Sequence, residues 1–168
     1  AGQILSMILG GGISSRLFQE IREKNGLAYS VFSYMNSYCD SGIFGLYAST
    51  AHDKIPELIT RLITEICKIC QQIESTELER AKAQVKATFL MAEESTAFKS
   101  EEIGRNYSLF HKFIKPEQIL ATIENIKPHN LQDIAKKIFS SKPVVSAIGT
   151  DISTRVNYEA ITKQLQNC

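Results

Sequence analysis

Long hydrophobic runs and an excess of charge of one sign are both missing from this 168-residue chain. No apolar stretch approaches the roughly 20 residues that a membrane-spanning helix needs, so we expect a soluble protein with no membrane partner. The chain has 19 basic and 18 acidic residues, giving a formal net charge of +1. Surfaces that bind nucleic acid are strongly basic, so nucleic acid is disfavoured as a partner. The remaining composition, 43% hydrophobic and 22% charged, suits a globular unit with a sizeable core.

The common motifs of hydrolytic and metal-binding sites are also absent. The histidines are too far apart in sequence to form H-x-x-E-H or H-E-x-x-H, and no G-x-S-x-G elbow occurs; they are His52, His111 and His129. The glycine-rich stretch LGGGISSR lacks the lysine of a phosphate-binding loop, so it is interpreted as a structural turn. We therefore expect neither a catalytic residue nor a metal ligand in this chain.

The cysteines could suggest a redox or zinc site, because two of them form a C-x-x-C pair; they are Cys39, Cys67, Cys70 and Cys168. The pair lies inside a predicted helix, whereas a redox pair needs a helix N-terminus and zinc needs further ligands. We expect free thiols packed on an apolar helical face. Free thiols favour a reducing compartment, either a bacterial cytoplasm or a space like the mitochondrial matrix, while a periplasmic location stays open.

The patterns that are present predict an α+β fold. Two runs rich in aromatic and β-branched residues, 27–36 and 42–50, flank a turn segment and predict an antiparallel hairpin. Apolar residues at helical spacing predict a long helix after residue 53 and several more helices downstream. Asp53 and the pair Thr76 and Glu79 have the spacing of N-terminal caps, and residues 143–150 resemble a short buried strand. We expect an antiparallel sheet covered by several helices.

The chain begins in the middle of a pattern, because Ile4, Leu5, Ile8 and Leu9 have helical spacing with no start signal before them. Three strands would also make a thin sheet. We therefore expect residues 1–168 to be a single C-terminal domain of a longer protein, with the first strand or strands missing.

Arg22 and Tyr29 stand on either side of a short turn, since Asn25 and Gly26 end the helix that carries Arg22. A surface arginine and a packed strand tyrosine would explain them without any function. However, both side chains can converge at the same edge of the sheet. A guanidinium and a phenol are suitable donors to the carbonyl groups of an extended peptide.

The stretch LGGGISSRLFQEIREKNGLAYSVFSY resembles the start of the C-terminal half of pitrilysin/insulinase-type zinc metallopeptidases, a family that includes mitochondrial processing peptidase and its bacterial relatives. The resemblance continues through SGIFGLYAST and ELERAKAQVKATFLMAEES to PVVSAIGT, so it spans nearly the whole chain. The first stretch is the most specific part of the resemblance.

The resemblance implies one half of a two-domain, clamshell-shaped metallopeptidase that encloses peptides in a chamber. In this family the N-terminal half holds zinc through an inverted H-x-x-E-H motif and a distal glutamate, and the motif glutamate is the general base. Because this chain lacks that motif, the resemblance implies the non-catalytic half, which would pair with a catalytic half on the same chain or on a separate subunit. Arg22 and Tyr29 fall on the positions that bind the substrate backbone in the family.

The alternative is a structural subunit without peptidase activity, since some similar subunits are core proteins of a respiratory complex. Under the first interpretation the parent protein is a zinc endopeptidase and its substrate is a peptide. Under the second, the chamber cleaves nothing. Zinc in the parent assembly would discriminate between the two.

Overall fold

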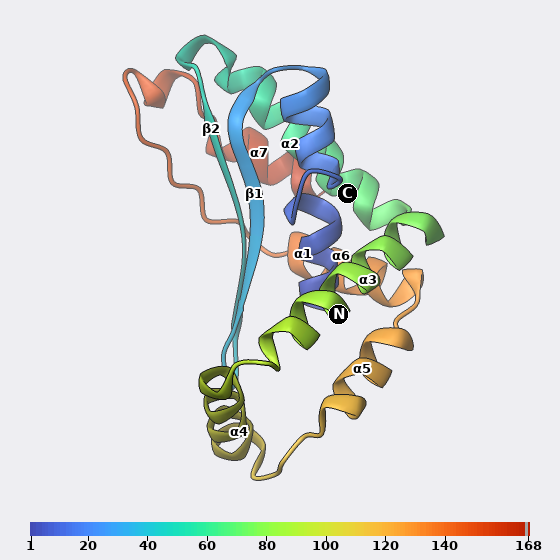
Figure 1. The fold of residues 1–168 in the computed structure, drawn as a ribbon. Helices are drawn as coiled ribbons and strands as arrows, with labels where there is room; N and C mark the ends of the chain where they lie inside the picture. The colour runs from blue at the N-terminus through green and yellow to red at the C-terminus, as the bar shows by residue number, and fades with distance from the viewer. Residues whose placement is uncertain (167) are drawn as a thin grey trace.

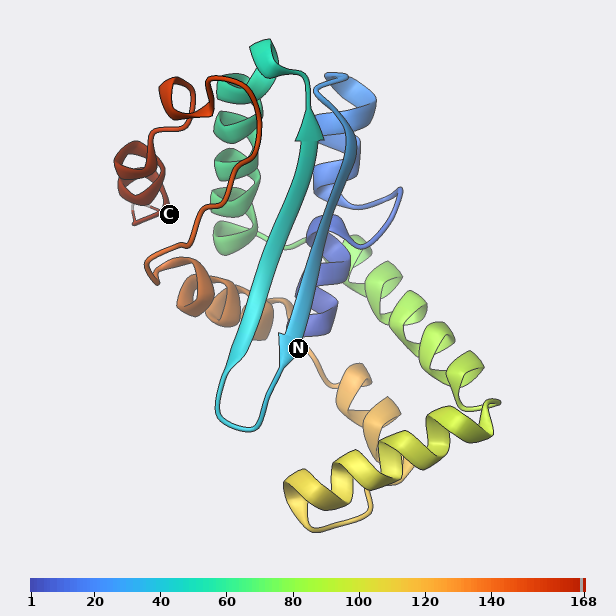
Figure 2. The ribbon, with the colours of Figure 1, turned by 90° about the vertical axis from the view of Figure 1, so that its left-hand side faces the viewer.

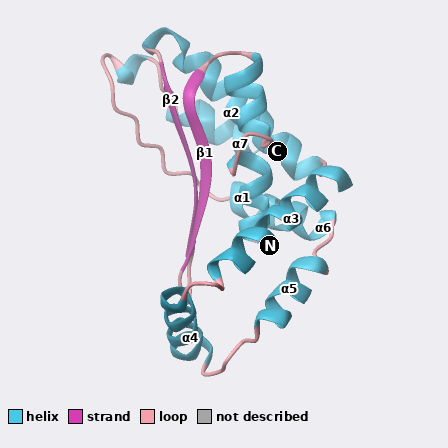
Figure 3. Ribbon diagram, in the orientation of Figure 1, coloured by secondary structure: helices cyan, strands magenta, loops and turns pink. Residues whose placement is uncertain are grey.

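A computed structural model describes residues 1–166 and residue 168 of the chain. The elements in chain order are α1 (Gly2–Gly10), the π-helix η1 (Phe18–Lys24), β1 (Ala28–Ser37), β2 (Gly42–Thr50), the 3₁₀-helix η2 (His52–Lys54), α2 (Ile55–Gln71), α3 (Ser75–Ala92), α4 (Thr96–Phe110), α5 (Pro116–Glu124), α6 (Pro128–Phe139), the 3₁₀-helix η3 (Ile152–Thr154) and α7 (Tyr158–Gln166). The α+β class is confirmed (Figure 3).

The predicted hairpin is confirmed, with β1 and β2 paired antiparallel from Ala28↔Thr50 to Ser37↔Gly42. In the part of the chain that the structure describes, this pair is the whole sheet. Figure 2 looks at the open face of the hairpin, with the helices behind it. Figure 1 shows the same arrangement from the side, and Figure 2 also shows α3, α4 and α5 extending away from the hairpin as an arm.

The core lies between the inner face of the hairpin and the helices α1, α2 and α6. Ile4, Leu5 and Leu9 of α1 are at most 1% exposed, and α1 packs directly on β1. Gly10 permits this close approach, because a Cβ atom there would lie 2.4 Å from the backbone nitrogen of Ser33. The Ser33 hydroxyl also donates to the carbonyl of Ser6 over 2.7 Å, so the buried polar atoms of this contact are paired.

Residues 143–150 do not form the buried strand that the sequence predicts. They run as an extended loop on the β2 side of the hairpin (Figure 1), and the side chains of Val144 and Ile148 are 97% and 99% exposed. A strand needs a hydrogen-bonded neighbour, and no described strand pairs with this segment.

The predicted caps are also wrong. Residue 53 lies within η2, and α2 starts at Ile55 after Lys54 with no side-chain cap. The helix α3 starts at Ser75 after Glu74, again without a side-chain cap. Glu79 instead pairs with Lys82, with 2.9 Å between Oε1 and Nζ.

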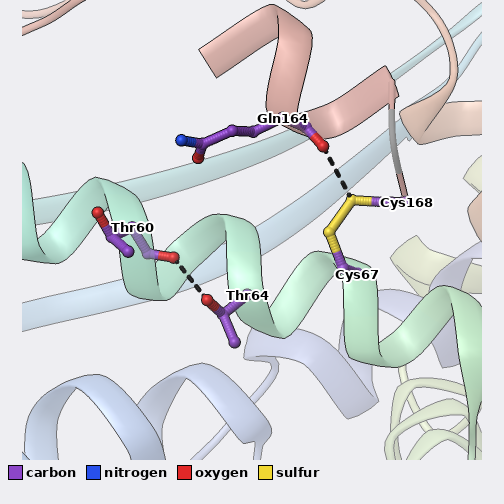
Figure 4. Close-up of a disulfide and its surroundings, with 5 residues drawn as sticks. All are labelled: Thr60, Thr64, Cys67, Gln164 and Cys168. Carbon is purple, nitrogen blue, oxygen red and sulfur yellow. Dashed lines mark hydrogen bonds between the residues drawn. A yellow bond between two sulfur atoms is a disulfide. The ribbon is translucent and has the colours of Figure 1, made fainter. Parts of the chain in front are cut away.

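The expectation of free cysteines is wrong for two of the four. The helix α7 packs on α2, which brings Cys168 to Cys67, and the two form a disulfide across 101 residues of sequence (Figure 4). Cys39 is free and exposed, and Cys70 is free and buried on the apolar face of α2. The free-thiol reason for favouring a reducing compartment therefore fails for Cys67 and Cys168. No helix among the described residues is long and apolar enough to cross a membrane.

Candidate functional site

The turn between η1 and β1 sets the positions of Arg22 and Tyr29. Gly26 adopts a φ of +54°, a left-handed conformation that glycine takes at little cost and that reverses the chain after a helix. The amide of Gly26 donates to the carbonyl of Arg22 over 3.0 Å, and the amide of Leu27 donates to the carbonyl of Ile21 over 2.8 Å. These bonds fix the last turn of η1 against the first residue of the hairpin.

A β-bulge turns Tyr29 towards solvent. Along β1 the buried residues Val31 and Ser33 alternate with exposed ones, and the same alternation would direct Tyr29 into the core. The pairing with β2 shifts between Ala28 and Ser30, and Tyr29 is 84% exposed. Bulges redirect individual side chains in this way and are frequent beside active sites.

The Arg22 guanidinium lies against the Tyr29 ring. Its Cζ atom is 5.2 Å from the centre of that ring and 4.7 Å from the centre of the Phe18 ring. Contact between a guanidinium and aromatic faces contributes roughly 0.5–1 kcal/mol at exposed sites and orients the planar group. The N–H groups of the guanidinium point outward within its own plane. Contact through the flat face therefore leaves these groups able to donate hydrogen bonds.

Few groups compete for these donors within the described residues. Glu23 is the nearest acid to Arg22, with 4.0 Å between Nε and Oε1, which is longer than a hydrogen bond. The Arg22 side chain is 39% exposed and Tyr29 is 84% exposed. An oriented arginine and an exposed phenol can therefore donate together to neighbouring carbonyl oxygens of a bound chain.

Charged side chains of η1, η2 and α2 also contact the turn region. Glu20 pairs with Lys24 at 3.2 Å and with Arg61 of α2 at 3.1 Å. The hydrogen bond from Lys24 holds the pKa of the Glu20 carboxyl below its ordinary value, with the positive charges of Lys24 and Lys68 acting in the same direction. The Lys54 ammonium donates to the carbonyl of Gly26 over 2.9 Å, which ties the turn to the end of the hairpin.

The structure thus brings together the two residues that the sequence singled out. Their contact with a peptide remains a prediction. The sequence did not point to Phe18, whose ring also contacts the guanidinium. Its spacing of four residues from Arg22 on a helix is the signal that could have indicated it.

The three histidines lie in different elements of the fold. His52 accepts a hydrogen bond from Nε of Arg155 over 2.9 Å. His111 ends α4 in a left-handed conformation, and His129 lies in the first turn of α6. Among the described residues, no group of three or more His, Cys, Asp or Glu side chains could hold a metal ion.

Comparison with known proteins shows the family to which this fold belongs. The family model for the "Peptidase M16 inactive domain" matches residues 1–85. An uncharacterized zinc protease from Rickettsia felis is 53% identical over 147 residues, which is 88% of this chain and 36% of that protein. The α subunit of mitochondrial-processing peptidase from Rattus norvegicus is 29% identical over 175 residues, which is 98% of this chain and 33% of that protein. A chain of complex III2 from Candida albicans has a similar fold, with a TM-score of 0.83 at 21% identity over 98% of this chain and 42% of that one.

The fold and the match to relatives define a non-catalytic domain of a zinc protease family. The chain belongs to the peptidase M16 family, the insulinase-like metallopeptidases, as its C-terminal inactive domain. It spans about a third of the length of the curated relatives it matches. The resemblance drawn from the sequence is therefore confirmed.

Proposed function

We propose that residues 1–168 are the substrate-binding domain of a longer or multi-subunit zinc endopeptidase. A catalytic half, on the same chain or on a separate subunit, would carry the zinc and the general base. The two halves would enclose a peptide in a chamber between them. The observation that supports this most directly is the convergence of Arg22 and Tyr29 at the end of the hairpin, with Cζ of Arg22 at 5.2 Å from the tyrosine ring.

The peptide would lie extended and be held through its backbone. Carbonyl oxygens accept hydrogen bonds, and the outward groups of this pair are donors. Tyr29 would donate to the carbonyl at or beside the scissile bond, and Arg22 to a neighbouring carbonyl. Since both contacts use the main chain, they would hold peptides of many sequences, as expected when an extended peptide is recognised by backbone hydrogen bonds.

Conservative substitutions in the assembly with the catalytic half test this role. Tyr29→Phe removes one hydrogen-bond donor near the oxygen on which negative charge develops. Loss of such a donor typically lowers the rate about 100-fold, so we expect kcat/KM for a fluorogenic peptide to fall by about that factor. Arg22→Lys keeps the charge but loses the planar fork, and we expect a smaller fall, about tenfold. Zinc content, measured by mass spectrometry, is expected to stay at the wild-type level.

Matched controls come from α4, where Tyr107 is 64% exposed and Arg105 is also exposed. Tyr107→Phe and Arg105→Lys are expected to leave kcat/KM unchanged. Wild-type kinetics in both Tyr29→Phe and Arg22→Lys would contradict the proposed role. A native assembly that contains no zinc and cleaves no peptide would instead favour the structural subunit.

A further inference from the structure

Apart from the Cys67–Cys168 disulfide, the helix α7 is attached to the molecule by few contacts. The helices α1 and α7 contain nine residues each. Seven residues of α1 are buried, whereas the buried residues described in α7 are Ile161 and Leu165. Among the described elements, α2 is the one on which α7 packs extensively. Packing therefore holds α7 much more weakly than it holds α1.

Hydrogen bonds add little to this attachment. From residue 142 onward, one hydrogen bond among the described residues reaches an earlier element, from Nε of Arg155 to Nε2 of His52 over 2.9 Å at the surface. The Tyr158 hydroxyl donates to the carbonyl of Pro143, which lies within the same segment. The ion pairs described for the chain all lie outside this segment. Polar contacts therefore leave the segment largely independent of the core.

A helix as short as α7 does not persist without support. Isolated helices of fewer than about 12–15 residues are marginal in water, because the first turn costs more than its hydrogen bond returns. The helix α7 therefore depends on its contact with α2. The disulfide makes that contact intramolecular over a very short distance and so keeps the local concentration of α7 at its docking surface high.

The disulfide is also accessible to small thiols. Cys67 and Cys168 are both partly exposed, whereas Cys70, one helical turn from Cys67, is 1% exposed. Thiol–disulfide exchange begins when a thiolate attacks one sulfur atom, so its rate depends on access to that atom. Reduction of this bond therefore does not require the core to open first.

We propose that the Cys67–Cys168 disulfide is a redox-controlled tether that keeps α7 docked on α2. A dithiol reductant attacks one sulfur through its thiolate and forms a mixed disulfide, and the other cysteine leaves as a thiolate that takes up a proton. The second thiol of the reductant then attacks the mixed disulfide and releases the remaining cysteine as a thiol. Two electrons and two protons pass to the protein, and the reductant becomes a disulfide.

The consequence of reduction is local. The helix α7 leaves α2 and loses its helical structure, while the packed region of α1, α2 and the hairpin stays folded. This inference goes beyond the proposed function and does not depend on it.

Hydrogen–deuterium exchange followed by mass spectrometry tests the tether in the native assembly that contains this chain. The assembly is measured after oxidation with diamide and again after reduction with dithiothreitol. Peptides covering α7 are expected to exchange at least tenfold faster after reduction, because amides protected by docking become exposed. Peptides covering α1 and β1 are expected to change less than twofold. A second oxidation is expected to restore the protection of α7.

Cysteine variants assign the effect to this disulfide. In Cys168→Ser, α7 is expected to exchange as fast as in the reduced wild type under both conditions. Cys39→Ser removes an exposed free thiol and is the matched control, so its α7 is expected to respond to reduction as in the wild type. Alkylation of Cys70, which lies in the core, reports on the rest of the fold and is expected to stay slow after reduction.

Three outcomes would overturn the inference. The first is equal protection of α7 in the two states, with alkylation showing that the thiols of Cys67 and Cys168 are free after reduction. The second is an increase in exchange at α1 and β1 as large as that at α7, since the disulfide would then stabilise the whole fold. The third is the absence of a Cys67–Cys168 linked peptide after oxidation. Should Cys168→Ser fail to fold, the cycle of oxidation and reduction in the wild type still decides among these outcomes.

Discussion

The helices α1 and α4 differ in composition, since α1 has no charged residue and α4 has four, and they contribute differently to the molecule. In α1 the side chains of Leu5 and Leu9 are fully buried. Of the residues described in α4, Asn106 alone is buried, and Tyr107 and Phe110 are 64% and 55% exposed. Stability is therefore concentrated where α1, α2 and the hairpin meet, beside the Arg22–Tyr29 pair. A rigid support of this kind is what a backbone-binding pair requires.

The largest expected difference in the free energy of unfolding is between a core leucine, Leu5, and an isoleucine of the arm, Ile103. Leu5→Ala removes a fully buried side chain and is expected to lower the free energy of unfolding by about 2–5 kcal/mol. Ile103→Ala, at a position that is 48% exposed, is expected to change it by less than about 0.5 kcal/mol. Urea titrations followed by circular dichroism measure both. Equal losses in the two variants would show that α4 packs as tightly as α1.

The disulfide adds a covalent tie to the packed region. Cys168→Ser removes a disulfide that closes a loop of about 100 residues. Removal of such a disulfide typically lowers the free energy of unfolding by about 2–4 kcal/mol. Cys39→Ser, at an exposed free thiol, is the matched control and is expected to have no effect.

Thiol titration of the untreated protein provides a second measurement of the same disulfide. Cys39 is expected to react at once, and Cys70 only on unfolding, because burial shields its thiol and raises its pKa. Four reactive thiols in the unfolded, unreduced protein would contradict the Cys67–Cys168 bond.

Substitutions of two glycines, one in the core and one in the arm, are expected to change the stability of the protein in opposite directions. Gly10→Ala places a Cβ atom 2.4 Å from the Ser33 backbone and is expected to destabilise the protein by about 1–3 kcal/mol. Gly104→Ala lies within α4 with nothing within 4 Å of the new Cβ atom, and is expected to stabilise the protein by about 0.5–1 kcal/mol. Opposite signs in thermal melting are the expected result. A stabilised Gly10→Ala variant would exclude the close contact between α1 and β1.

The smallest expected effect concerns Glu20 at the site turn. The pKa of this carboxyl is lower in the folded protein than in the unfolded chain. Its contribution to the free energy of unfolding is therefore present above the unfolded pKa and is lost as pH falls through the folded pKa. Glu20→Gln is expected to cost at most about 1 kcal/mol at pH 7, and the difference from wild type should shrink in strong acid. Urea titrations across this pH range measure it. A difference that is constant with pH would rule out the ion pairs as its cause.

Local signals in the sequence were sufficient to predict the hairpin, the turn at Gly26 and most helices, because hydrophobic period and turn chemistry act over a few residues. The pair at Arg22 and Tyr29 could be predicted for the same reason, since a short turn joins the two residues. The errors depend on distant contacts. The segment 143–150 has a strand-like pattern but no partner strand among the described residues, and the disulfide joins residues 101 positions apart.

Within the site, the sequence did not reveal how the pair is oriented. The bulge that turns Tyr29 outward arises from the register of β1 on β2, which alternation along one strand does not encode. The support from Lys54 and Arg61 comes from another element and becomes visible only in three dimensions.

Photo-crosslinking from position 29 tests the central claim most directly. Replacing the 84% exposed Tyr29 with p-benzoylphenylalanine keeps a ring at the same place, and the assembly with the catalytic half is then irradiated with a labelled, uncleaved peptide. The account predicts a crosslink between this chain and the peptide that excess unlabelled peptide abolishes, and no crosslink from the same group at position 107. A folded assembly that binds the peptide without any crosslink from position 29 would contradict it.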